Sequence, residues 1–182
     1  MLTDLQKRKF KREFETYDAN GDGILEKKDF DIAADKLIAG LKLADGDDRA
    51  KAVRTVYTGW WQDLVAHRDS DGDKRLDFDE WMAHADTISQ AANANYEQKI
   101  VAQGTMLFHF IDFDSDGKID ASEFGLWLGA FGVSSEVAQQ SFAKLDREGQ
   151  GFLSQANLTD AMREFFVDDN ESAPGNWLFG PL

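Results

Sequence analysis

The sequence predicts an all-α protein built from four helix–loop–helix units, and two observations support that prediction. The chain has 182 residues and contains four copies of one aspartate-led loop, which begin at Asp18, Asp69, Asp112 and Asp146. Apolar residues spaced three or four apart, the period of an α-helix, flank every copy. We expect the four units to form two pairs within one compact globule, with short β-bridges between paired loops.

Each flanking segment carries one apolar face, which predicts an amphipathic helix on either side of every loop. Around the first loop the apolar positions are Phe10, Phe14 and Tyr17, then Phe30, Ala34, Leu37 and Leu41. Around the second they are Trp61, Leu64 and Val65, then Trp81, Ala85 and Ile88. Around the third they are Leu107 and Ile111, then Phe124, Trp127, Leu128 and Phe131. Around the fourth they are Ala138, Phe142 and Leu145, then Leu158, Ala161, Met162 and Phe165.

The loops follow the twelve-residue EF-hand pattern that binds calcium. A hard cation of this size takes six to eight oxygen ligands at about 2.3–2.6 Å, so acidic or amide side chains at positions 1, 3 and 5 suit it. Position 7 supplies a backbone carbonyl, and position 12 closes the cage, usually with both oxygens of a glutamate. The residues at position 12 are Asp29, Glu80, Glu123 and Asn157. Three near-complete copies distinguish this pattern from ordinary turns rich in Asp and Gly.

Two further loop positions have structural roles. Position 6 turns with a positive φ, which favours glycine, and Lys74 replaces glycine there at a cost of about 1–2 kcal/mol. Position 8 is apolar in all four loops. We expect it to join paired loops back to back in an antiparallel bridge, Leu25 with Leu76 and Ile119 with Leu153.

The negative charge of the chain is concentrated in these loops. Thirty-four Asp and Glu against twenty Lys and Arg give a formal net charge of −14. Fourteen acids stand at ligand positions, namely Asp18, Asp22, Glu26, Asp29, Asp69, Asp71, Asp73, Asp77, Glu80, Asp112, Asp114, Asp116, Asp120 and Glu123. The rest of the chain is therefore balanced in charge. The acidic excess argues against nucleic acid as a partner and against stable membrane association.

The four loops differ in what they offer a cation. The third has every preferred feature. The first closes with Asp29, whose shorter side chain favours a smaller coordination number and competition by Mg²⁺. The second offers five acids, which we expect to outweigh the cost of Lys74. The fourth has Asn157 at position 12 and Gln150 at position 5, so we expect a structural partner for the third loop rather than a metal site.

The layout of the whole chain resembles that of the sarcoplasmic calcium-binding proteins of invertebrates and of the related calerythrin-like proteins of bacteria. The shared features are a long segment between the first two loops, a degenerate last loop and the ending Leu-Phe-Gly-Pro-Leu at residues 178–182. The resemblance implies a cytosolic Ca²⁺/Mg²⁺ buffer in which residues 1–92 (hands 1 and 2) and 93–182 (hands 3 and 4 with the tail) share one apolar core, and we expect it to bind about three Ca²⁺.

The same resemblance implies a ligand set. Carried over residue by residue, the family's ligand positions are Asp18, Asn20, Asp22, Ile24 (carbonyl) and Asp29; Asp69, Asp71, Asp73, Arg75 (carbonyl) and Glu80; and Asp112, Asp114, Asp116, Lys118 (carbonyl) and Glu123.

Two other functions compete with buffering. A calcium sensor exposes a methionine-rich groove to a target helix, but here we expect only Met82, Met106 and Met162 to lie inside the body, and aromatic residues dominate. A protein that holds an apolar small ligand is the third class, because luciferin-binding proteins resemble this architecture and five Trp with three His could line a pocket.

The apolar tail bears on this choice. Trp177, Leu178 and Phe179 follow a Pro-Gly break and are too apolar to leave in water. We expect them to fold into the cleft between helices. An occupied cleft cannot receive a target helix, so the tail favours the buffer.

Several classes are excluded or disfavoured. The absence of cysteine excludes disulfides and thiolate metal sites, and the sequence contains no enzyme motif in its required context. The first ten residues lack the apolar core of a signal peptide, so we expect a cytoplasmic monomer that needs no protein target. The basic residues near the start should form the solvated face of the first helix: Lys7, Arg8, Lys9, Lys11 and Arg12.

Metal binding should stabilise the fold, because each acidic loop otherwise brings four or five repelling carboxylates together. One site with ligand at a thousandfold excess over Kd contributes about 4 kcal/mol. We therefore predict a clear rise in Tm on going from excess chelator to excess calcium, measured by circular dichroism. Equal melting temperatures in the two conditions would refute this expectation.

Overall fold

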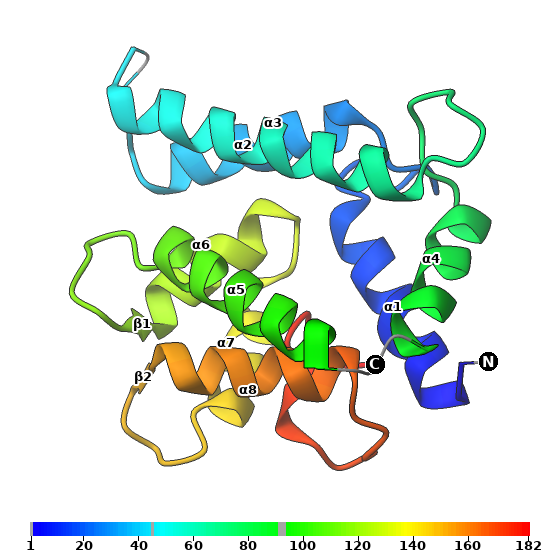
Figure 1. Cartoon of the computed structure of the whole chain (residues 1–182). Coiled ribbons are helices and arrows are strands. Elements are labelled where there is room, and N and C mark those ends of the chain that lie inside the picture. Colours follow the sequence, from blue (N-terminus) through cyan, green and yellow to red (C-terminus); the bar gives the residue numbers. More distant parts are fainter. Residues whose placement is uncertain (1, 45, 91–93) are drawn as a thin grey trace.

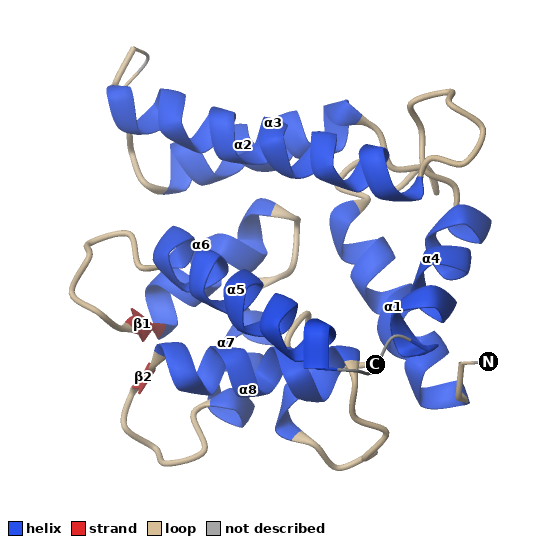
Figure 2. Ribbon diagram, in the orientation of Figure 1, coloured by secondary structure: helices blue, strands red, loops and turns tan. Residues whose placement is uncertain are grey.

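The computed structural model describes residues 2–44, 46–90 and 94–182, and the side chains of residues 87–97 lie outside the description. Its backbone is helical apart from loops and two short strands (Figures 1 and 2). The elements in chain order are α1 (Asp4–Tyr17), α2 (Lys27–Gly40), α3 (Asp48–Arg68), α4 (Phe78–Gln90), α5 (Ala94–Ile111), β1 (Ile119–Asp120), α6 (Ala121–Ala130), α7 (Ser135–Leu145), β2 (Phe152–Leu153), α8 (Gln155–Phe166) and the 3₁₀ turn η1 (Pro174–Trp177).

The all-α prediction of four helix–loop–helix units is confirmed, since each acidic loop lies between two helices. The predicted bridges are present as well. Leu25 and Leu76 exchange backbone hydrogen bonds of 3.0 Å in both directions, and β1 pairs antiparallel with β2 so that Ile119 faces Leu153. All four side chains are fully buried, which gives position 8 a role in the core. The proposed boundary between residues 92 and 93 lies outside the described residues, as does the side chain of Ile88.

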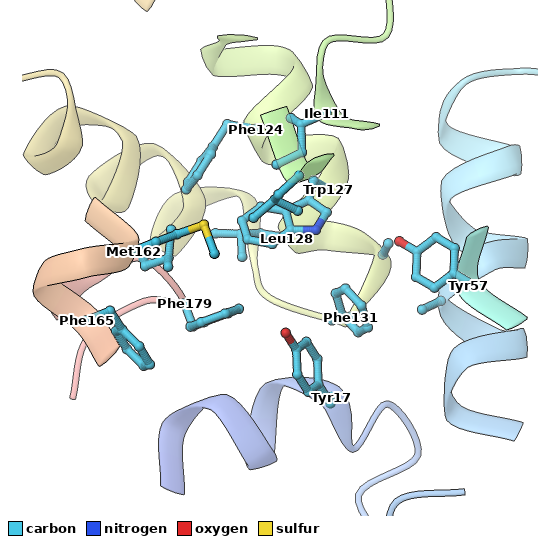
Figure 3. Close-up of a cluster of buried hydrophobic side chains, with 14 of the residues drawn as sticks. Tyr17, Tyr57, Ile111, Phe124, Trp127, Leu128, Phe131, Met162, Phe165 and Phe179 are labelled. Atoms are coloured by element: carbon cyan, nitrogen blue, oxygen red, sulfur yellow. The ribbon is translucent and has the colours of Figure 1, made fainter. Parts of the chain in front are cut away.

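One apolar core joins the two pairs of hands. Helix α2 packs against α3 and also against α6 of the other pair, while α5 packs against α8 and α6 against α7. Aromatic side chains from both halves converge at the centre (Figure 3). The ring of Phe131, in the turn after α6, lies 5.2 Å from that of Tyr17 in α1 and 5.7 Å from that of Tyr57 in α3. Neither pair of hands therefore has a separate core.

The tail folds back into this core, as expected. Leu178 and Phe179 are 0% and 2% exposed. The Phe179 ring lies 5.0 Å from Phe165, 5.8 Å from Tyr17 and 5.9 Å from Trp127, so it touches both halves (Figure 3). Trp177 departs from the expectation: it is only partly buried and lies beneath the ammonium of Lys144, 5.7 Å from the ring centre.

Two other expectations need correction. Lys9, placed by its sequence pattern on the solvated face of α1, is fully buried. Its Nζ donates hydrogen bonds of 2.7 Å to the backbone carbonyls of Glu164 and Asp168, at the end of α8. A helix end leaves such carbonyls without helical partners and carries partial negative charge, so a buried ammonium is favourable there. Met106, counted among the residues of the body, is 61% exposed.

The described helices include none that is both long and apolar enough to cross a membrane.

Lys9→Met should destabilise the protein in saturating calcium by about 2–3 kcal/mol, because two backbone carbonyls lose a charged donor whose side chain is buried. Lys7→Met is the matched control: the Lys7 side chain is half exposed and its ammonium lies 3.4 Å from Asp4, so its effect should stay within about 0.5 kcal/mol. Urea unfolding of both variants measures the difference. Equal stabilities would mean that Lys9 does not hold α1 to α8.

Candidate metal centres

Each loop is wound around its first aspartate. In all four, one carboxylate oxygen of position 1 accepts the backbone N–H of position 6, at 2.8 Å from Gly23 to Asp18 and 3.0 Å from Gly117 to Asp112. The amide at position 4 or 5 donates to the other oxygen, as Gly72 does to Asp69 at 2.7 Å. These bonds curl the chain, so that the side chains at positions 3 and 5 turn toward the same point.

The curl requires left-handed backbone at two positions of every loop. Position 6 has a positive φ throughout, and Lys74 adopts φ 62° despite its side chain, as the sequence predicts. Position 4 also has a positive φ, which the sequence analysis did not foresee. Glycine occupies it in three loops, whereas Ser115 takes φ 61° in the third. Each non-glycine residue there costs about 1–2 kcal/mol, which the loop's hydrogen bonds must offset.

The predicted ligand side chains at positions 1, 3 and 5 lie close together in the second and third loops. One carboxylate oxygen from each of Asp69, Asp71 and Asp73 lies within 4.8 Å of the others, and the equivalent residues of the third loop, Asp112, Asp114 and Asp116, do the same. In the first loop Asn20 takes the middle place, and its Oδ1 accepts the N–H of Asp22 at 2.9 Å.

The peptides predicted to offer carbonyls are fixed by position 5. The N–H groups of Ile24, Arg75 and Lys118 donate to Asp22, Asp73 and Asp116 at 3.1, 2.8 and 2.9 Å. The predicted ligands of the three loops are thus all oxygen atoms, which Ca²⁺ and Mg²⁺ prefer.

Position 12 closes the first three loops. In the third, Glu123 Oε1 accepts the N–H of Phe113 at 2.7 Å and Oε2 accepts that of Asp120 at 3.0 Å, so the carboxylate spans from the start of the loop to its end. Glu80 spans the second loop in the same way. In the first loop Asp29 Oδ1 accepts hydrogen bonds from both the backbone N–H and the side-chain amide of Asn20. Position 12 is also the third residue of the exit helix, so closure and helix capping use the same side chain.

The fourth loop closes differently. Asn157 Oδ1 accepts the backbone N–H and the hydroxyl of Ser154, at 2.9 and 2.7 Å, and so caps α8. The first aspartate, Asp146, still binds the amides of Gln150 and Gly151. This loop keeps the wound backbone, and its β2 strand supports β1 of the third loop.

Burial affects the closing carboxylates. It raises the pKa of Asp29 and that of Glu123, although the backbone N–H groups that each accepts act in the opposite direction. A divalent cation would supply the charge compensation that these half-desolvated groups need.

Two basic side chains at the first loop were missed by the sequence analysis. Lys28 Nζ lies 2.8 Å from Asp22 Oδ2 and 2.8 Å from Glu26 Oε2, and Arg75 Nε of the second loop lies 2.9 Å from Glu26 Oε1. The hydrogen bond from Lys28 is the main cause that lowers the pKa of Asp22 and of Glu26. The available signal was a lysine at position 11, where the other loops have Asp79, Ser122 and Ala156.

Four wound loops, of which three are closed by a carboxylate, define an EF-hand calcium-binding protein. Calerythrin of Saccharopolyspora erythraea is 27% identical over 168 residues, which cover 91% of this chain and 94% of that protein. The sarcoplasmic calcium-binding protein of Perinereis vancaurica tetradentata is 28% identical over 182 residues, with 99% of each chain covered. No protein-family model matches. The chain is therefore similar, over nearly its whole length, to calerythrin and to the sarcoplasmic calcium-binding proteins.

The fold is also that of a ligand-binding relative. The calcium-loaded apo form of the coelenterazine-binding protein of Renilla muelleri superposes with a TM-score of 0.82 at 23% identity, and the match covers 100% of both chains.

Glu123→Gln should weaken calcium binding at the third loop more than about tenfold, because the loop loses the charge of its closing carboxylate. The matched control is Glu148→Gln, the same change at position 3 of the fourth loop, which should leave every calcium affinity unchanged. Titration against a competing chelator measures both variants. Loss of a binding step in Glu148→Gln would show that the fourth loop binds metal.

Proposed function

We propose that this protein is a cytoplasmic, monomeric buffer of Ca²⁺ and Mg²⁺ that needs no protein target. In this proposal the first three loops each hold one ion through the ligands named from the sequence, and Mg²⁺ competes best at the first loop. Asp29 closes that loop, and its short side chain suits the smaller cation. Residues 1–92 and 93–182 act as two halves of one unit.

The observation that carries the proposal is the buried tail. A sensor needs an apolar groove that calcium can open for a target helix. Here Leu178 and Phe179 are buried, and the Phe179 ring packs against α1, α6 and α8. Burial of two such side chains is worth about 1.5–3 kcal/mol each, which a target helix would have to exceed.

Polar contacts hold the tail against α1. Arg12 Nε donates to the carbonyl of Phe179 at 2.8 Å, and Arg8 forms a two-oxygen contact with Glu171 at 2.6 and 2.7 Å. The Thr3 hydroxyl donates to Asp169 at 2.6 Å. Together with Lys9 on the end of α8, these contacts connect the helix that enters the first loop to the last segment of the chain.

The composition of the core also favours a rigid protein. Of Met82, Met106 and Met162, only Met162 is buried, and Met106 is exposed. Aromatic rings fill the centre instead, and rings have fewer rotatable bonds than methionine. Such a core resists the repacking that promiscuous target binding requires.

A second candidate is an apolar-ligand carrier, favoured by one observation. Within the described part of the chain, the Tyr57 hydroxyl and the Trp127 indole N–H are buried without a hydrogen-bond partner. A ligand with acceptor groups could satisfy them, as could buried water. Quenching of tryptophan fluorescence by added coelenterazine, absent in Tyr57→Phe, would support this role.

Fluorescence of the dye ANS separates buffer from sensor. We predict that dye binding stays low or falls as calcium rises from excess chelator to saturation in physiological Mg²⁺, because the ions close a core that the tail already fills. A variant ending at Ser172 serves as the positive control, and its dye fluorescence should be high. A steep rise with calcium in the full chain would indicate a sensor.

A further inference from the structure

A positively charged side chain, that of Lys28, contacts the acids of the first loop. Lys28 Nζ makes contacts of 2.8 Å with Asp22 Oδ2 and with Glu26 Oε2, which are the carboxylates at positions 5 and 9. Position 5 is a direct ligand position and position 9 acts commonly through a water. An ammonium group therefore sits on two of the four acids that the first loop offers to an ion.

The second loop adds another cation to the same acids. Arg75 Nε lies 2.9 Å from Glu26 Oε1, so both oxygens of Glu26 are ion-paired. The antiparallel bridge between Leu25 and Leu76 favours this contact, since it places their chain neighbours Glu26 and Arg75 opposite one another. The ion pairing of Glu26 in the first loop therefore depends on where the backbone of the second loop lies.

The other two acidic loops lack this arrangement in their sequences. Position 11 is Asp79 in the second loop and Ser122 in the third. The third loop does have Lys118 at position 7, but its ammonium lies 4.7 Å from the ring centre of Phe152, in the partner loop. The side chain of Lys118 is thus used in pairing with the fourth hand.

We propose that Lys28 is a tethered competitor of the metal ion, which weakens the first site relative to the third, and that Arg75 assists it from the second loop. The inference rests on the proposed function, because it assumes that the first loop binds calcium. An incoming ion must either displace Lys28 from Asp22 and Glu26 or bind beside a positive charge a few ångströms away. Either route costs affinity.

The size of the effect follows from exposure. The Lys28 side chain is 49% exposed and that of Asp22 is 42% exposed, so solvent screens the pair. An ion pair this exposed changes the affinity of a neighbouring site only slightly, by at most about fivefold. Removal of the ammonium should therefore tighten the first site by about two- to fivefold.

The test compares Lys28→Met with Lys27→Met. Both remove one positive charge from the start of α2, but Lys27 pairs with Asp31 at 2.5 Å on the helix surface and not with the loop. Amide NMR resolves the sites: Gly23 N–H is bound to Asp18 and Gly117 N–H to Asp112, so each reports its own loop. Calcium is set with a competing chelator in the full-length protein.

We expect Lys28→Met to bind calcium about two- to fivefold more tightly at Gly23, with Gly117 unchanged and Lys27→Met close to wild type. Arg75→Met should shift Gly23 in the same direction by less. Equal gains in the two lysine variants would mean a general charge effect and overturn the proposal, as would no gain in Lys28→Met. If the Gly23 amide does not respond to calcium in any variant, the first site itself fails.

Discussion

The crowding of carboxylates in three short loops is the constraint on which the rest of the structure depends. Each loop can bring its acids together only because backbone N–H groups at positions 4 to 6 bond to the first aspartate. That curl in turn requires left-handed backbone, which even Lys74 and Ser115 adopt. The loops thus bring their carboxylates together as a cation requires, and a bound cation would relieve the repulsion among them.

The same loops organise the core. Because position 8 lies in the bridge and position 12 lies on the exit helix, the geometry that gathers the acids also sets where each helix pair begins. The helices then meet around a cluster of aromatic rings to which the tail contributes Phe179 (Figure 3). Lys9 and Arg12 hold that arrangement from α1. Metal sites and core are thus parts of one unit, which suits a buffer better than a protein that must open.

Repetition made most of this predictable from the sequence. Four copies of one loop fixed the helix–loop–helix units and the bridge partners, and the apolar tail indicated its own burial. Long-range polar contacts were not predictable, because no local pattern tells a buried Lys9 from the solvated Lys7 two residues earlier. Lys28 was missed for a different reason. The ligand positions indicate which oxygen atoms can bind a metal ion, whereas the lysine at position 11 forms ion pairs with those same carboxylates. The positive φ of Ser115 could not be predicted from the sequence, because glycine, not serine, is the residue that indicates left-handed backbone.

The central claim is that three closed loops bind ions and the fourth, capped by Asn157, does not. The most direct measurement is the number of calcium ions bound per chain, by equilibrium dialysis or native mass spectrometry at saturating calcium. The account predicts three. A count of four would show that the fourth loop binds without a closing carboxylate, and a count of two would show that Lys74 or Lys28 prevents binding in its loop; either would contradict the account.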